Sequence, residues 1–257
     1  MAKMEEIASL FVGWEETMIW SCIQGHMGYA MTDREEHPES AQIVVGDFCF
    51  FAGRPDRALV EKAAAFLIAP QNEGWSRLIE EVWGEKVYRT SRYAIKKEPD
   101  VFDRDRLLQM TMEIPAGFEL KLIDRQIYEA CMTQGWSRDL CSQFKDYEDY
   151  AARGIGVVAL CGGVPVSGAS SYTIYTGGIE IEIDTKEEYR KRGLATAAGA
   201  GLILECLDRN IYPSWDAHDL RSVALAEKLG YHRGMEYTVY IKKCGDNNEF
   251  LQVGTET

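Results

Sequence analysis

The stretch GIEIEIDTKEEYRKRGLA, residues 178–195, joins a strand pattern, a basic turn and the start of a helical run. Isoleucines and acidic residues alternate over 179–184, a period of two that predicts a β-strand. A helix is predicted over 195–208. The first N–H groups of a helix have no intrahelical partner and lie at the positive end of its dipole. The stretch therefore predicts an anion-binding turn, in which Gly193 allows close approach of a phosphate to the backbone.

A basic helix start that is merely exposed to solvent explains the same turn, and on these residues alone this alternative stays open. Two other phosphate sites are excluded. The chain contains neither G-x-x-x-x-G-K-[ST] nor G-x-G-x-x-G, which are the fingerprints of P-loop and dinucleotide-binding sites.

The turn resembles the cofactor motif of the GNAT superfamily of acetyl-CoA-dependent N-acetyltransferases, [RQ]-x-x-G-x-[GA]. Arg190, Gly193 and Ala195 fill its defined positions. A second superfamily element, N-x-x-[SA]-x-x-L-Y-x-K-x-G-[FY], resembles residues 219–231. The matching residues are Ser222, Leu225, Lys228, Gly230 and Tyr231. Two motifs in the right order and spacing are far more specific than either one alone.

The second element departs from the pattern at two positions. Asp219 replaces the usual asparagine and Ala226 replaces the usual tyrosine. The amino-acid sequences of the two motifs and of the N-terminal half resemble those of a GNAT subfamily that includes zwittermicin-resistance-like acetyltransferases. The resemblance therefore covers nearly the whole chain.

The resemblance implies an α+β fold with a mixed, mostly antiparallel sheet. In this fold the central strand and the next strand diverge in a V, and the pantetheine arm of CoA inserts between them. The predicted order of elements after residue 113, βααβββαβαβ, is the GNAT order. Pro213 falls in the strand predicted over 211–215, where we expect it to break the pairing locally, because proline has no N–H to donate.

The predicted organisation is a smaller N-terminal α/β domain, residues 1–112, a GNAT domain, residues 113–244, and an acidic tail, residues 245–257. The N-terminal part has no second phosphate-turn motif, and a degenerate GNAT-like half is one interpretation of it. Its expected role is to cover the acceptor site. A tight hairpin or a bulged strand is predicted around Gly46 and Asp47. A helix is predicted from Asp56 to Leu67, and a further helix over 138–152.

The chain has 257 residues, a formal net charge of −13 and a sequence pI of about 4.9. Such a charge disfavours nucleic acid and anionic membrane surfaces as partners. It suits a cationic amine substrate, although solubility alone also explains it.

The seven cysteines include no C-x-x-C pair and predict reduced, buried thiols rather than disulfides or a metal site. With no signal peptide or spanning segment predicted, we expect a cytoplasmic protein. The oligomeric state stays open, with a homodimer as one alternative.

The resemblance also assigns the acetyl-CoA site residue by residue. The pyrophosphate would lie on the turn and the pantetheine amides would pair with the strand backbone, while the second motif adds Asp219 and Ser222. The implied cofactor-binding residues are Ile183, Thr185, Arg190, Lys191, Arg192, Gly193, Leu194, Ala195, Thr196, Asp219 and Ser222.

Glu182 occupies the strand position where many family members carry the glutamate that deprotonates the amine, so the resemblance makes it the candidate catalytic base. The alternative is that Glu180, Glu182 and Asp184 form one solvated face of the strand. The general acid is left open, because Ala226 stands in the place of the tyrosine. The alternatives are Tyr231, Tyr237, His218, Ser222, a water molecule, or departure of the CoA thiol as a thiolate without help.

Two classes of function follow. The first is an N-acetyltransferase that moves an acetyl group from acetyl-CoA to a primary amine of a small molecule. The second is a non-catalytic acyl-CoA-binding or regulatory module, which the losses at Asp219 and Ala226 favour. Both require the phosphate turn.

Overall fold

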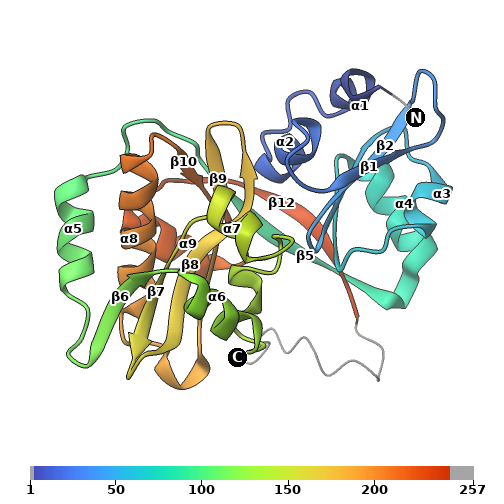
Figure 1. The fold of residues 1–257 in the computed structure, drawn as a ribbon. Coiled ribbons are helices and arrows are strands. Elements are labelled where there is room, and N and C mark those ends of the chain that lie inside the picture. The colour runs from blue at the N-terminus through green and yellow to red at the C-terminus, as the bar shows by residue number, and fades with distance from the viewer. Residues whose placement is uncertain (1–2, 244–257) are drawn as a thin grey trace. The chain divides into compact units, whose positions relative to one another are not determined.

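The computed structural model describes residues 3–243 and divides into two compact units. The first contains the described residues of 1–91 and 238–257, and the second contains residues 92–237 (Figure 1). Strands β5 (Val87–Ile95) and β12 (Arg233–Lys242) have residues in both units. The boundary expected after residue 112 does not coincide with this division, and the expected tail, 245–257, lies outside the described residues.

The first unit is built on a sheet whose strand order is β1-β2-β3-β4-β12-β5, with β11 of the second unit after β5. Its further elements are α1 (Met4–Leu10), α2 (Thr17–Ile23), β1 (Tyr29–Thr32), β2 (Ser40–Val45), β3 (Phe48–Gly53), α3 (Arg57–Glu61), β4 (Leu67–Pro70), α4 (Glu73–Trp83) and η1 (Gly84–Lys86). The hairpin predicted around Gly46 is confirmed, because Val45 pairs with Phe48 across it.

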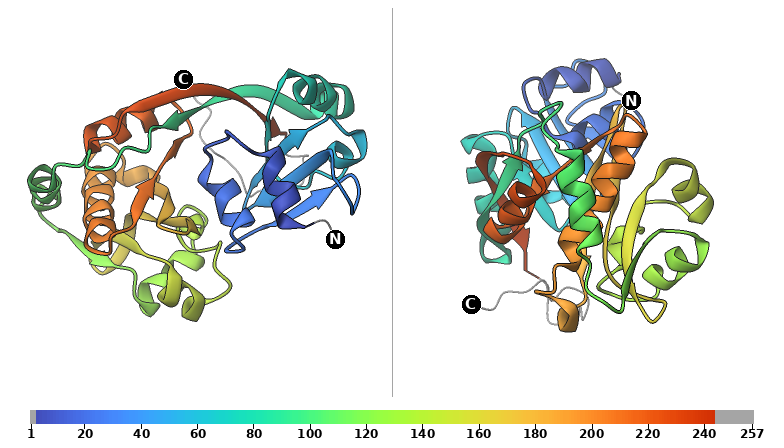
Figure 2. Two further views of the ribbon diagram at one scale, coloured as in Figure 1. Left: turned by 90° about the horizontal axis from the view of Figure 1, so that it is seen from above. Right: turned by 90° about the vertical axis from the view of Figure 1, so that its left-hand side faces the viewer.

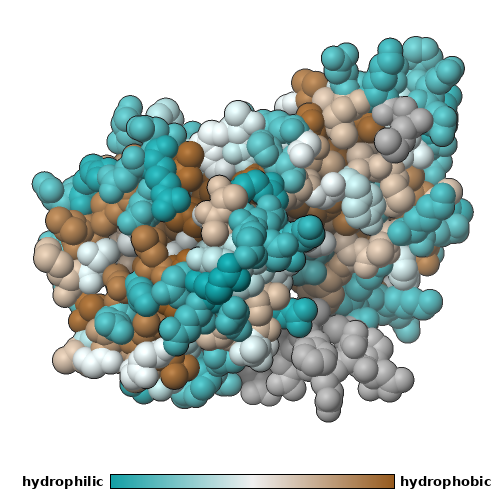
Figure 3. Space-filling view, in the orientation of Figure 1, coloured by the Kyte–Doolittle hydropathy of each residue, from teal (hydrophilic) through white to brown (hydrophobic). Residues whose placement is uncertain are grey.

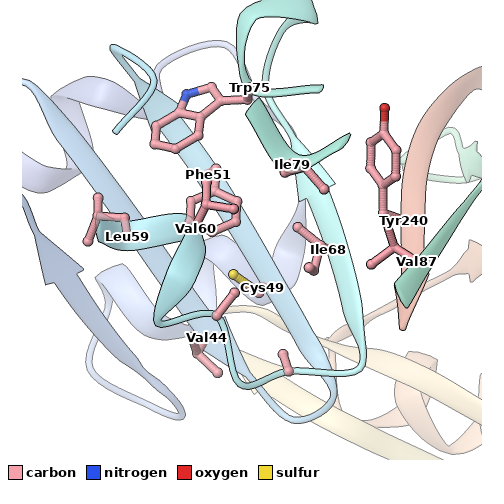
Figure 4. Packing of buried hydrophobic residues seen from close by; sticks show 12 residues of the cluster. Val44, Cys49, Phe51, Leu59, Val60, Ile68, Trp75, Ile79, Val87 and Tyr240 are labelled. Carbon is pink, nitrogen blue, oxygen red and sulfur yellow. The ribbon is translucent and has the colours of Figure 1, made fainter. Parts of the chain in front are cut away.

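The core of the first unit gathers around Trp75 of α4, which is 0% exposed. Its ring stacks on Phe51 at 4.7 Å between centroids, and its Nε1 donates to the carbonyl oxygen of Gly53 at 3.0 Å. Tyr240 joins this cluster from β12 (Figure 4). The first unit therefore has a hydrophobic core of its own.

Asp56 caps α3 as predicted, since its carboxylate accepts from the N–H of Leu59 at 2.9 Å. The helix predicted to extend to Leu67 is wrong, because α3 ends at Glu61. Residues 67–70 instead form β4, which pairs parallel to β3 and anchors the buried run Leu67, Ile68 and Ala69. Burial in the sheet overrides the helical pattern here.

The second unit contains elements of the GNAT order predicted after residue 113, together with further elements that this order did not include. These are α5 (Arg104–Met112), β6 (Phe118–Leu122), α6 (Arg125–Met132), η2 (Arg138–Leu140), α7 (Tyr147–Arg153), β7 (Gly156–Cys161), β8 (Val164–Tyr175), β9 (Gly178–Thr185), η3 (Glu187–Tyr189), α8 (Leu194–Asp208), β10 (Tyr212–Ser214), β11 (Asp216–Ala217) and α9 (Leu220–Leu229). A five-stranded sheet runs in the order β10-β9-β8-β7-β6.

Helix α8 packs closely on this sheet, and α5 packs against the side of α8 that faces away from the sheet (Figure 2). Glycines allow the close approach. A Cβ added at Gly199 would lie 2.9 Å from Leu229 Cδ1 and 3.2 Å from Ile183 Cδ1. Ile183 therefore faces α8, and by alternation the acidic residues of β9 face the opposite side of the sheet.

The helix predicted over 138–152 is wrong in extent. The segment forms the short η2 and then α7, which begins at Tyr147 after the N-cap residue Asp146. The Asp146 carboxylate accepts from the N–H of Asp149 at 2.9 Å, so this residue starts a new helix rather than continuing one.

Strands β9 and β10 diverge, which confirms the V implied by the resemblance. They pair in parallel through three residues only, ending at the pair Glu180 and Ser214. The chain then enters β11, which pairs with β5 in the other sheet. Pro213 lies within the paired part, so the break expected at this residue is wrong in position. Strand β10 is an edge of its sheet, where proline is tolerated.

Hydrophilic and hydrophobic residues are interspersed over the visible face of the molecule (Figure 3). None of the helices in residues 3–243 has the length and apolar character required to span a membrane.

Candidate active site

The turn before α8 presents backbone N–H groups at an uncapped helix end. Among the α-helices that the structure describes, only α1 and α8 begin without a side-chain cap. Gly193 is the N-cap residue of α8, with φ of 80°, and Lys191 has φ of 60°. The N–H groups of Leu194, Ala195 and Thr196 begin the helix and have no intrahelical acceptor. The turn thus offers several donors at the positive end of the longest helix.

The arginines of the turn are braced by backbone carbonyls. Arg190 Nε donates to the Thr185 oxygen at 3.2 Å, and Arg192 Nη2 donates to the Glu188 oxygen at 3.0 Å. The Arg192 guanidinium also lies 5.2 Å from the centre of the Tyr189 ring. These contacts hold the guanidinium groups of Arg190 and Arg192 in place, although both residues are exposed to solvent.

The structure brings the two sequence motifs together. Lys228 Nζ, from the second motif on α9, donates to Thr196 Oγ1 in the first turn of α8 at 3.3 Å. Thr185, at the end of β9, pairs its hydroxyl with Ser167 Oγ at 2.7 Å. The turn, the end of β9 and α9 thus form one constellation within the second unit.

Asp219 and Ser222 are committed to protein contacts. Asp219 caps α9, with Oδ1 accepting from the N–H groups of Arg221 and Ser222, both at 2.9 Å. Burial opposes ionisation of this carboxyl, but the N–H of Ser222 and the Arg221 guanidinium outweigh it, and the pKa of Asp219 is lowered. Ser222 Oγ accepts from Trp215 Nε1 at 3.1 Å. Their expected part in cofactor binding stays a prediction.

The acidic row of β9 is not uniformly solvated. Glu180 is only 4% exposed, whereas Glu182 and Asp184 are half-buried. Burial raises the pKa of Asp184, although the N–H of Thr185 works against this. The alternating sequence does not predict that Glu180 is more buried than Glu182, because burial depends on which other residues cover each side chain.

Glu182 lies opposite Ser170 of β8 in the strand register. Ser170 Oγ is 2.8 Å from the hydroxyl of Tyr150, which comes from α7. The candidate base therefore sits on the sheet face that α7 reaches, and it is partly withdrawn from solvent.

The candidate general acids differ in the groups that they contact. Ala226, in the tyrosine position, is 0% exposed. Tyr231 is buried and donates to the Pro213 oxygen at 2.6 Å, and burial raises its pKa well above the ordinary value. Tyr237 donates to Asp216 Oδ2 at 2.7 Å. Neither phenol has its proton directed at an open strand edge.

His218 is held as a neutral imidazole. Its Nδ1 lies 3.3 Å from Arg92 Nη1, and arginine can only donate. Burial and the neighbouring Arg92 lower the pKa of His218. The ring is therefore a poor source of protons at neutral pH.

Comparison with known proteins agrees with this geometry. The family model described as GNAT acetyltransferase matches residues 8–240. The chain belongs to the GNAT acetyltransferase family.

Relatives of this GNAT protein support the assignment. A GCN5-related N-acetyltransferase-like protein from Streptococcus suis has a crystal structure that is 47% identical, with 93% of this chain and 98% of that chain covered and a TM-score of 0.91. The curated protein "Uncharacterized N-acetyltransferase YdfB" from Bacillus subtilis is 28% identical over 185 residues, which are 70% of this chain and 67% of the relative.

A GCN5-related N-acetyltransferase from Kribbella flavida is 18% identical, with 96% and 98% of the two chains covered and a TM-score of 0.53, a likeness of fold alone. Together these findings confirm the GNAT fold. The narrower subfamily resemblance stays a prediction.

Proposed function

We propose that this GNAT protein transfers the acetyl group of acetyl-CoA to a primary amine of a small molecule. The observation that carries the proposal is the uncapped N-terminus of α8, with Gly193 at φ of 80°, beside the edge of β9 that β10 leaves open. A pyrophosphate needs clustered N–H donors, and a pantetheine arm needs an unpaired strand edge. This chain places both within one unit.

The fit of CoA to these residues follows from the donor set. The N–H groups of residues 192–196 would hold the pyrophosphate, with Arg190 and Lys191 adding positive charge. The backbone of Ile183 and Thr185 would pair with the pantetheine amides. When bound, acetyl-CoA supplies an activated acetyl thioester.

Glu182 has the role of general base in this proposal. The acceptor arrives as an ammonium ion and must lose a proton before its nitrogen can attack the thioester carbon. Glu182 lies on β9 between the closed end of the V and the phosphate turn, and it is partly buried. Partial burial makes a carboxylate a better proton acceptor. The negative charge of the chain favours a cationic acceptor.

The second candidate function is a non-catalytic acyl-CoA-binding module, which the buried Ala226 in the tyrosine position favours. The test is CoA release over a panel of polyamines, aminoglycosides and amino acids. We expect turnover with at least one amine. Tight acetyl-CoA binding without turnover on the whole panel would contradict the transferase and support the binding module.

A further inference from the structure

Three buried polar side chains form a row across β8, β9 and β10. The register pairs Glu180 with Thr173 on one side and with Ser214 on the other, so the three side chains share one face of the sheet. Their exposed fractions are 4% for Glu180, 0% for Thr173 and 1% for Ser214. Carboxyl groups are very rarely buried to this extent, because burial costs the charged form its hydration.

A tyrosine hydroxyl contacts this row. Tyr175 OH lies 2.8 Å from Ser214 Oγ, and among the described residues Thr173 Oγ1 has no hydrogen-bond partner. Burial, with the nearby Glu180 as a further cause, raises the pKa of Tyr175, Tyr212 and Tyr231. These phenols stay neutral at physiological pH.

Glu180 and Glu182 are a pair of carboxyl groups in different surroundings. They lie two residues apart on one strand face, about 6–7 Å along the strand. Two like charges at that separation in a partly buried site oppose each other's ionisation. Glu180 is the more buried of the two, so burial opposes ionisation more strongly at Glu180 than at Glu182. Such a division commonly separates an acid from a base.

The pair also lies where the reaction would occur. Glu180 and Ser214 are the last residues paired between β9 and β10, so Glu180 marks the closed end of the V. From Thr185 back to Glu180 the strand rises about 16 Å. If the pyrophosphate lies on the turn and the pantetheine along Thr185 and Ile183, the thioester extends toward that closed end. This step rests on the proposed function.

We propose that Glu180 is the proton donor to the departing CoA sulfur, in the role for which Ala226 provides no hydroxyl. The ammonium first loses one proton to Glu182, which passes it to solvent. The nitrogen then forms a C–N bond with the thioester carbon, and Glu182 takes its second proton. The C–S bond breaks with its electron pair on sulfur, which takes the proton of Glu180. Proton transfer from Glu182 to Glu180 restores both groups, with one net proton released.

The test compares Glu180→Gln with Glu182→Gln, the same change two residues apart on one strand face. We expect the wild-type kcat to fall at low pH as Glu182 gains a proton and at high pH as Glu180 loses one. Glu180→Gln should lower kcat by about 100-fold or more and remove the alkaline limb, whereas Glu182→Gln should remove the acidic limb. Acetyl-CoA affinity, measured calorimetrically, should change little in both variants.

A donor with a better leaving group sharpens the comparison. An acetyl thioester of an aromatic thiol, whose thiolate is more stable than that of CoA, needs less protonation as it departs. We expect Glu180→Gln to be less impaired with this donor than with acetyl-CoA, and Glu182→Gln to be equally impaired with both. Equal impairment of Glu180→Gln with both donors, or an unchanged kcat, would overturn the proposal.

A spectroscopic measurement keeps the inference separate from the proposed function. In protein labelled with ¹³C-glutamate, infrared spectra at neutral pH should show a protonated carboxyl band in the wild type and in Glu182→Gln, and no such band in Glu180→Gln. Absence of the band from the wild type and Glu182→Gln overturns the proposal even if Glu180→Gln does not fold. A wild type that shows the band but acetylates no amine contradicts the proposed function instead.

Discussion

Gly193 is required for its backbone conformation rather than for lack of space inside the protein. Its φ is 80°, and a Cβ built there would contact no atom within 4 Å. A branched side chain would strain the turn and would occupy the side from which a phosphate approaches. We therefore expect Gly193→Val to weaken acetyl-CoA binding by orders of magnitude in calorimetric titration, since several charge-assisted N–H contacts are lost at roughly 1.5–3 kcal/mol each.

Gly163→Val is the matched control for this prediction. Gly163, in the β7–β8 hairpin, has φ of 82° and also has no atom within 4 Å of an added Cβ. Both variants should lose similar stability, within about 0.5–3 kcal/mol, but only the change at Gly193 should weaken binding. If folded Gly193→Val binds acetyl-CoA as the wild type does, the turn is an ordinary helix start.

Glu182→Gln should lower kcat/KM by about 100-fold to 10,000-fold at neutral pH, the usual contribution of a general base. Glu119→Gln, at an exposed position of β6 in the same sheet, is the control and should leave kcat/KM unchanged. Steady-state kinetics with the best amine of the panel provides the measurement. Equal activity of both variants would return Glu182 to the interpretation of a solvated strand face.

At the scale of the element, α9 depends on the Asp219 cap. Asp219→Ala should destabilise the fold by about 1 kcal/mol, whereas Asp219→Asn keeps an acceptor oxygen for the N–H groups of Arg221 and Ser222 and should cost less. Denaturant unfolding at neutral pH measures both. A similar loss for both variants would show that the charge matters more than the cap.

The pH dependence of this cap has a definite sign. Because the pKa of Asp219 is lowered in the fold, the stability gained from its ionisation is present above the pKa of the unfolded chain, about 3.9. It is lost as the pH falls through the folded value. The stability difference between the wild type and Asp219→Asn should thus shrink in acid, and a difference that is constant with pH would contradict this.

Local patterns predicted the central strand, the turn that follows it and α8, because period, charge and motif all lie within about thirty consecutive residues. The same reasoning failed for the length of α3 and for residues 138–152. Leu67 is placed in β4 by pairing with distant β3, and α7 is restarted by a cap that a helical pattern conceals. The burial of Glu180 likewise depends on neighbours from β8 and β10, so alternation along β9 could not show it.

At the scale of the whole molecule, ligand binding should shift the unfolding equilibrium. Acetyl-CoA should raise the thermal midpoint through the mass-action term RT ln(1 + [L]/Kd), whereas NAD and ATP at equal concentration should raise it much less. Differential scanning calorimetry with the three ligands provides the measurement. Equal stabilisation by all three would contradict a site selective for CoA, since all three carry a pyrophosphate.

The path of β12 constrains the order in which this protein can fold as it is synthesised. Tyr240 and Ile241 pair with Ile68 and Leu67, so the last described strand completes the sheet of the first unit. A nascent chain therefore holds β4 without this neighbour until residues 240–241 have been translated. Such an unpaired strand edge is where a partly made chain is most prone to aggregate or to require a chaperone. Strands β1 to β4 are synthesised before the second unit, yet their sheet is completed only after it.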